Sequence, residues 1–168
     1  MHFKFLKGKF DKMTSDEIFM SRAIELAKEA ASDGEVPVGA VIVRDGEIVG
    51  YGRNRREKGK NALAHAEIEA IDMACKTLGG WRLPRCTIYI TLEPCPMCCG
   101  ALVNSRIERA VIAAHDAKTG ALGSVLNFNS YPLNHKIKAE YGLMRKESEA
   151  LMQDFFARIR EKRKLHSL

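Results

Sequence analysis

The sequence predicts a single α/β domain with helices on both faces of a mixed sheet of about five strands. Three observations predict this class. Apolar residues recur at helical spacing in three long segments, short β-rich runs separate those segments, and 168 residues can enclose one core of ordinary size. We therefore expect residues 1–168 to form one domain.

The first helix is expected over residues 15–32. Thr14 and Glu17 have the spacing of a capping box at its start, and Asp33-Gly34 is a typical stop signal. The apolar residues at helical spacing are Met20, Ala23, Ile24, Ala27 and Ala31. Residues 1–13, which precede this helix, are expected to form a loosely ordered basic arm.

A β-hairpin is expected after the first helix. Residues 36–43 are β-rich, Asp45-Gly46 is a two-residue turn signal, and the chain returns through residues 47–52. Residues 53–60 then carry five basic side chains and one acidic side chain, and we interpret them as a polar loop.

The middle of the chain alternates helices with buried strands. A helix is expected over residues 64–78, and its buried face is predicted to be Ile68, Ile71, Cys75 and Leu78. Residues 86–92 and 109–114 are apolar enough for central strands. A short helix over 96–104 lies between them, because Pro96 suits a first helical position.

The C-terminal part is irregular before the last helix. Residues 115–135 are rich in Gly, Asn and Ser, and residues 137–141 are an ambiguous short strand. A final helix over 145–164 places Leu151, Phe155 and Ile159 on one face. We expect residues 145–168 to form a basic helix and tail.

Composition excludes several classes of protein. With 46% hydrophobic and 29% charged residues, the chain is not expected to be largely disordered, and no apolar run approaches the ~18 residues of a membrane span. The N-terminus alternates Lys with apolar residues and lacks the apolar core of a secretory signal. A net charge of +6 leaves an anionic partner open.

The cysteines favour a reducing compartment, and hence the cytoplasm. Their number is odd and three of them fall within five residues, whereas a secreted disulfide protein would pair and spread them. They are Cys75, Cys86, Cys95, Cys98 and Cys99. This pattern indicates a metal or thiol site.

Two short motifs contain the residues with the clearest chemistry. His65–Glu67 opens one expected helix and Pro94–Cys98 opens another, and Cys95 and Cys98 share a face in a first helical turn. One imidazole and two thiolates select Zn²⁺ among the common metals. Three protein ligands leave a fourth position for the water of a catalytic site.

Each motif has a less specific interpretation when taken alone. A C-x-x-C is commonly a structural zinc site or a redox pair, and an H-x-E is usually a solvated helix face. A structural zinc needs a fourth ligand, for which Cys99 is nearest, but adjacent residues rarely both reach one tetrahedral ion. We therefore interpret Cys99, Cys75 and Cys86 as core residues.

Together the motifs match the H-x-E…P-C-x-x-C signature of zinc-dependent nucleobase deaminases. Zinc lowers the pKa of its bound water to about 7, and the hydroxide attacks the carbon that bears an exocyclic amine. Glu67 is expected to carry the proton from the water to the leaving ammonia. The predicted reaction is the hydrolytic deamination of a purine or pyrimidine.

Further segments, together with these motifs, make residues 15–164 resemble one family, the bacterial tRNA-specific adenosine deaminases of the cytidine/deoxycytidylate deaminase superfamily. The zinc motifs alone would also admit guanine, cytosine and riboflavin-pathway deaminases. The segments that carry the resemblance are Glu35–Val41, Ala64–Ile68, Thr91–Cys98, Asp116–Ser124, Leu133–His135 and Asp154–Phe156.

The resemblance implies a three-layer α/β/α cytidine-deaminase-like fold and a role for each matching residue. His65, Cys95 and Cys98 would bind zinc, with Glu67 as the proton shuttle. The residues implied in substrate binding are Asn54, which would hydrogen-bond the flipped adenine, Ala66 and Pro94, and Asp116 and Lys118, which would contact anticodon nucleotides. Family members are homodimers that convert the wobble adenosine of an arginine tRNA to inosine.

Several features keep alternatives open. Without the resemblance, Asn54 and Asp116 are more simply a turn residue and part of a solvated turn. Arg53 stands where the family often has Trp, and Leu63 where Thr is common. Residues 53–60 and 157–168 could neutralise tRNA phosphates, or the latter could be a solvated helix end.

Two other functions remain open on this sequence. A deaminase of free nucleobases or nucleosides would use the same zinc chemistry without an RNA-binding surface. A zinc-stabilised, non-catalytic subunit would usually lack the acidic proton shuttle, and Glu67 is present.

Overall fold

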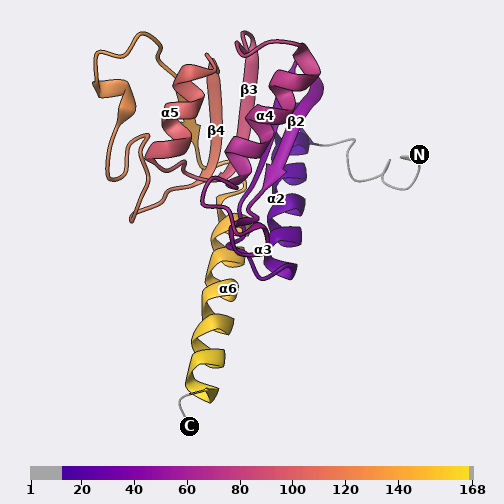
Figure 1. Ribbon diagram of the computed structural model, residues 1–168, viewed down its shortest axis with the longest axis vertical. Coiled ribbons are helices and arrows are strands. Elements are labelled where there is room, and N and C mark those ends of the chain that lie inside the picture. The colour runs from indigo at the N-terminus through magenta and orange to yellow at the C-terminus, as the bar shows by residue number, and fades with distance from the viewer. Residues whose placement is uncertain (1–12, 167–168) are drawn as a thin grey trace, which may run out of the picture.

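The computed structural model describes residues 13–166, whose arrangement is drawn in Figure 1. Apart from Met13, the predicted N-terminal arm lies outside the described residues, as do the last two residues of the tail. Within the described residues, no helix has the length and apolar character that a membrane crossing needs.

Five strands form one mixed sheet in the order β2-β1-β3-β4-β5. Their bounds are β1 Gly39–Arg44, β2 Glu47–Arg53, β3 Cys86–Leu92, β4 Arg109–Ala114 and β5 Lys138–Tyr141. β1 pairs antiparallel with β2 and with β3, whereas β4 pairs parallel with both β3 and β5. The predicted mixed sheet is confirmed, and residues 138–141 of the ambiguous segment do form a strand.

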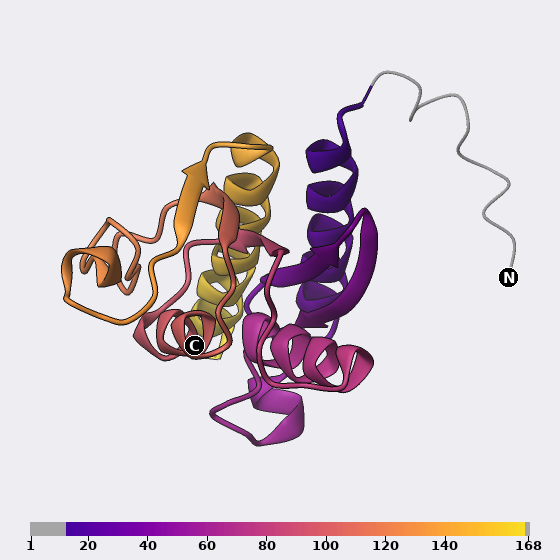
Figure 2. The same ribbon diagram turned by 90° about the horizontal axis from the view of Figure 1, so that it is seen from above.

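Helices lie on both faces of this sheet (Figure 2), which confirms the predicted three layers. Their bounds are α2 Ser15–Ser32, α3 Arg56–Gly59, α4 Ala66–Leu78, α5 Pro96–Asn104 and α6 Arg145–Leu165, with a short 3-10 turn, η1, at Phe128–Ser130. α4 and α5 cover one face, and α2 and the start of α6 cover the other. The rest of α6 extends beyond the sheet (Figure 1).

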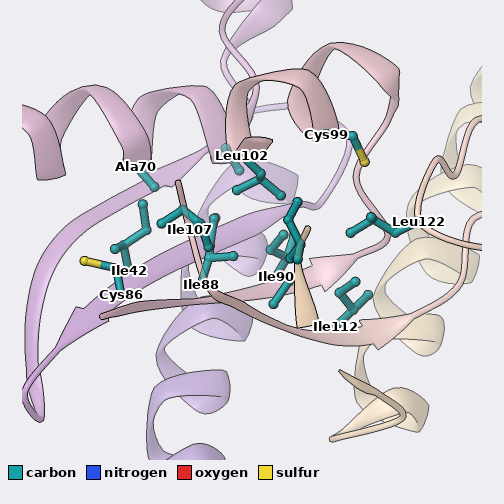
Figure 3. Close-up of a cluster of buried hydrophobic side chains, with 14 of the residues drawn as sticks. Ile42, Ala70, Cys86, Ile88, Ile90, Cys99, Leu102, Ile107, Ile112 and Leu122 are labelled. Carbon is teal, nitrogen blue, oxygen red and sulfur yellow. The ribbon is translucent and has the colours of Figure 1, made fainter. Parts of the chain in front are cut away.

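The strand side chains alternate between two apolar clusters, as expected for a sheet covered on both faces. Figure 3 shows the cluster under α4 and α5, where Ile42, Ile88 and Ile90 lie against Ala70 and Leu102. The opposite cluster contains Val41, Val43, Tyr89 and Val111 together with Met20, Ala23, Ile24 and Leu26 of α2.

α4 lies unusually close to β2 because both elements present small residues at the contact. A Cβ atom added to Gly52 would lie 2.3 Å from the carbonyl oxygen of Ala66, and one added to Gly50 would lie 2.3 Å from that of Ala70. The close approach fixes the position of the first turn of α4 against the sheet.

The predicted buried face of α4 was therefore wrong. Its buried residues are Ala66, Glu67, Ala70 and Ala74. Ile71, Cys75 and Leu78 are only partly buried at the margin of the core, and Ile68 is also half-buried. Helical periodicity counted large apolar side chains, whereas the contact with β2 requires small ones.

The other differences are local. β1 begins at Gly39 rather than residue 36, because the N–H of Val38 donates to the carbonyl of Val36 (2.8 Å) in a tight turn. The segment predicted as a polar loop contains the short helix α3. The buried carboxylate of Glu35 accepts hydrogen bonds from the N–H groups of Glu57 (3.2 Å) and Lys58 (2.8 Å), which fixes this helix.

Candidate active site

The two predicted motifs occupy the N-termini of two helices on the same face of the sheet. His65 is the N-cap residue of α4, and Cys95 is the N-cap residue of α5, with Pro96 in its first turn. β3 ends at Leu92, so the Pro94–Cys98 motif leaves the sheet where a central strand stops. Helix N-termini favour thiolates, because their N–H groups and dipole stabilise negative charge.

The three predicted metal ligands lie together. The Nδ1 atom of His65 is 3.8 Å from the sulfur of Cys95 and 3.6 Å from that of Cys98, and one donor atom from each residue falls within 4.8 Å of the others. One imidazole nitrogen and two sulfur atoms at this spacing are a donor set that suits Zn²⁺.

Without a metal ion, Cys95 ionises far more readily than Cys98. The Cys98 thiol donates to Cys95, which lowers the pKa of Cys95 to about 4 and raises the pKa of Cys98. The hydrogen bond with Cys95 also raises the pKa of His65. A bound divalent cation would compensate both thiolates, as ligand deprotonation requires.

Glu67 lies beside this cluster and is 4% exposed. Burial raises the pKa of Glu67 to about 7, although its own backbone N–H and the neighbouring imidazole of His65 act in the opposite direction. A carboxyl group with a pKa near neutrality can both accept and donate a proton at physiological pH.

A pocket of about 120 Å³ brings together five of the predicted site residues. They are Asn54, His65, Glu67, Cys95 and Asp116. The pocket is also lined by residues that the sequence did not single out for this site: Val36, Val38, Arg56, Leu92, Glu93 and Thr119. A larger cavity of about 560 Å³ lies between α2, β2 and α4 and contains none of the proposed metal ligands.

Asn54 is held in one orientation by the backbone of α4. Its Oδ1 atom accepts a hydrogen bond from the N–H of Ala66 (3.0 Å), and the residue is 6% exposed. Because Oδ1 is engaged, the Nδ2 group remains as a donor. The N–H of Ala66 is used in this contact, and Ala66 is not among the residues that line the pocket.

Glu93 lies within the Thr91–Cys98 segment, but the sequence predicted no role for this residue in the site. Its carboxylate accepts from the N–H groups of Asp116 (3.1 Å), Leu122 (3.1 Å) and Ser124 (3.0 Å), and from the Ser124 hydroxyl. Burial would raise the pKa of Glu93, but these hydrogen bonds outweigh it and lower that pKa. An acidic residue directly after a buried strand was the available signal.

Glu93 therefore organises the loop that places Asp116 in the pocket. Gly120 lies against it, since an added Cβ would come within 2.5 Å of the Glu93 carboxyl carbon. In the same loop, Lys118 is exposed and its N–H donates to Asp116 (2.9 Å), but Lys118 does not line the pocket.

Pro94 and Cys99, the neighbours of the cysteine ligands, make contacts within the fold. The carbonyl of Pro94 accepts from the N–H of Ala121 (2.9 Å), so Pro94 joins the motif to the same loop. Cys99 is fully buried and its sulfur lies 3.6 Å from that carbonyl. Cys86 is fully buried as predicted, whereas Cys75 is only partly buried.

Comparison with known proteins gives the same assignment along the chain. The family model of MafB19-like deaminases matches residues 14–160. A tRNA-specific adenosine deaminase from Bacillus subtilis (strain 168) is 46% identical over 153 residues, which cover 90% of this chain and 95% of that protein.

Two solved structures are similar in fold. One, from a study of A-to-I editing by tRNA:A34 deaminases at the wobble position of transfer RNA, has a TM-score of 0.78 and 41% identity, covering 80% of this chain and 98% of that chain. A guanine deaminase from Nitrosomonas europaea has a TM-score of 0.74 and 26% identity, covering 84% of each chain. The chain belongs to the family of tRNA-specific adenosine deaminases.

Proposed function

We propose that this protein hydrolyses adenosine to inosine and ammonia at the wobble position of tRNA. The observation that carries the proposal is the pocket in which Glu67, His65 and Cys95 face the same space as Asn54. The family of the chain supports tRNA as the substrate. An arginine tRNA is the substrate we expect, from the resemblance of the sequence.

His65, Cys95 and Cys98 are proposed to hold one Zn²⁺ per subunit. Zinc bound there supplies a water molecule activated at neutral pH. The three side chains provide a soft, compact donor set, and the two helix N-termini favour its thiolates.

Glu67 is proposed as the proton shuttle. Its carboxylate accepts a proton from the attacking water and returns one to the departing amine, so that the C–N bond breaks and a carbonyl remains. The buried position of Glu67 supports both transfers, because its raised pKa leaves either form accessible near neutral pH.

Asn54 is proposed to orient the base. The Nδ2 group left free by the contact with Ala66 can donate to a ring nitrogen of adenine. Asp116, which lines the pocket, and Lys118, which does not, are proposed to contact anticodon nucleotides. The exposed basic side chains near the end of α6 are proposed to contact tRNA phosphates. Phosphate contacts of that kind give salt-dependent binding.

The protein is also proposed to act as a homodimer in the cytoplasm. Large apolar side chains stay exposed in the single chain, including Leu63 (58%) and Val125 (53%), and a second subunit would cover such residues. Light scattering after size-exclusion chromatography measures the mass, and a monomer at micromolar concentration contradicts the dimer.

The test of the proposed function uses the purified zinc-loaded protein and an anticodon stem-loop that carries a wobble adenosine. Inosine should form, and binding should weaken steeply as salt rises. Because the fold is also similar to that of a guanine deaminase, the competing activity is the deamination of free guanine. Consumption of free guanine without inosine in the stem-loop contradicts the proposal, and zinc binding without any turnover favours a non-catalytic subunit.

A further inference from the structure

The basic segment 53–60 is mostly neutralised by the protein itself. Three of its five cations form ion pairs with acidic side chains of α2, α4 and the turn after α2. These pairs are Arg53 with Glu29 and with Asp33 (2.9 Å), Arg55 with Glu69 (2.8 Å), and Lys58 with Asp33 (3.1 Å). The segment is therefore not a uniform phosphate-binding patch.

Arg56 differs from these neighbours. Within residues 13–166, its guanidinium has no acidic partner at ion-pair distance and no side-chain hydrogen bond, and the residue is exposed at the start of α3. Of the five cations in this segment, Arg56 is the one that lines the catalytic pocket, beside Asn54. An exposed guanidinium that lines the pocket and has no acidic partner among residues 13–166 is available for an anionic ligand.

Arg56 also lines a second pocket, of about 250 Å³, that adjoins the first. The two pockets share Val36, Asn54 and Arg56. The second pocket is walled by α6 through Phe155 and Phe156, whose rings are 5.4 Å apart at their centroids. Arg56 thus stands at the boundary between the site of the chemistry and an aromatic compartment.

A nucleotide chain that places one base in the catalytic pocket must carry its phosphates across this boundary. Glu57 also lines the second pocket, so that pocket favours an uncharged base over a phosphate. The boundary itself offers the planar fork of Arg56, which matches two phosphate oxygens. Phosphate contacts of this kind position a substrate without reading its sequence.

On the basis of the function proposed above, we propose that Arg56 is a substrate-positioning residue that binds a phosphate flanking the target adenosine. The contact holds the backbone where the base can enter the pocket. Loss of the contact should raise KM and weaken stem-loop binding about tenfold, as expected for a charged hydrogen-bonding group.

The test compares Arg56→Gln with Lys76→Gln, which removes the same charge from an exposed position at the opposite end of α4 from His65. Arg56→Gln should reduce kcat/KM about tenfold and lower the slope of log K against log salt by about 0.7 to 1. Lys76→Gln should change neither value by more than about twofold. Arg56→Lys, which keeps the charge, should restore part of the loss.

A chemical change in the RNA then isolates the contact. One stem-loop carries a neutral methylphosphonate 5′ of the target adenosine and another carries it 3′. The wild-type protein should lose about tenfold with one of them, while Arg56→Gln should lose less than about twofold with that same substrate. Equal losses in both proteins at both linkages overturn the inference, as does an Arg56→Gln variant that matches the wild type.

The proposed function can fail separately. Wild-type protein that produces no inosine from the unmodified stem-loop overturns the proposed function. If the wild-type protein produces inosine but loses no more activity than Arg56→Gln with either methylphosphonate, only the role of Arg56 is overturned. RNA binding can be measured without turnover in proteins that carry Glu67→Ala. Fluorescence anisotropy that compares Glu67→Ala alone with Glu67→Ala plus Arg56→Gln then reports the phosphate contact independently of catalysis.

Discussion

Replacing Gly52 by alanine should damage the active site through the contact between β2 and the first turn of α4. The new Cβ would lie 2.3 Å from the carbonyl oxygen of Ala66, whereas ordinary contact begins at 3.4 Å, so helix and strand must separate by about 1 Å. Ala66 is flanked by His65 and Glu67. The displacement therefore falls on one proposed metal ligand and on the proton shuttle.

The size of the effect follows from this geometry. Forcing an extra methyl group into a packed contact costs about 1–3 kcal/mol of unfolding free energy. A misplacement of about 1 Å at reacting groups can cost about 100-fold in rate. Gly50→Ala meets Ala70 at the same distance, one helical turn further from His65, so we expect a similar stability loss and a smaller loss of activity.

Urea denaturation, zinc content and inosine formation measured on the same preparations test this expectation. Gly80→Ala is the matched control, because no atom lies within 4 Å of its added Cβ. The reasoning is refuted if Gly52→Ala retains wild-type stability and activity. It is also refuted if Gly50→Ala loses as much activity per unit of stability lost.

Three further results are expected. Glu67→Ala should keep its zinc and fold, measured by metal analysis and circular dichroism, while turnover falls at least about 100-fold; loss of zinc would make Glu67 structural. Glu93→Gln should lower the unfolding free energy by about 1–3 kcal/mol, because one amide oxygen cannot serve every donor that the carboxylate accepts; an unchanged urea midpoint contradicts this. Arg109 lowers the pKa of Asp16, and lowers that of Glu140 to about 2, so their stabilisation is present above pH ~4 and is lost as pH falls toward 2. Arg109→Met should flatten that acid dependence in denaturation midpoints, and an unchanged slope contradicts the assignment.

The sequence was sufficient wherever local chemistry decides the structure. The capping box was confirmed, since the Thr14 hydroxyl accepts from the N–H of Glu17 (3.2 Å) and the Glu17 carboxylate accepts from the N–H of Thr14 (2.7 Å). Strands β1 to β4 were located to within three residues because their β-rich runs are bounded by clear turn signals.

Structure that depends on distant partners could not be predicted in this way. α3 has no apolar periodicity, and its backbone is fixed by Glu35, about twenty residues earlier in the chain. The loop around Asp116 takes its shape from Glu93. The buried face of α4 was misassigned because the glycines that determine it lie on another element, β2.

The candidate site shows the same division. Spacing along the chain predicted the cluster of His65, Cys95 and Cys98. His65 and Cys95 are helix N-caps, Cys98 lies in the first turn that follows Cys95, and helix starts have recognisable signals. The pocket around that cluster includes Arg56 and Glu93, whose importance depends on neighbours far away in sequence. Segment charge alone did not separate Arg56 from the paired cations beside it.

Sequencing tRNA from cells that lack this protein tests the central claim most directly. The account predicts adenosine in place of inosine at the wobble position, with inosine restored by the wild-type gene and not by the Glu67→Ala variant. Inosine that persists in the deleted cells, or that returns with the Glu67→Ala variant, would contradict it.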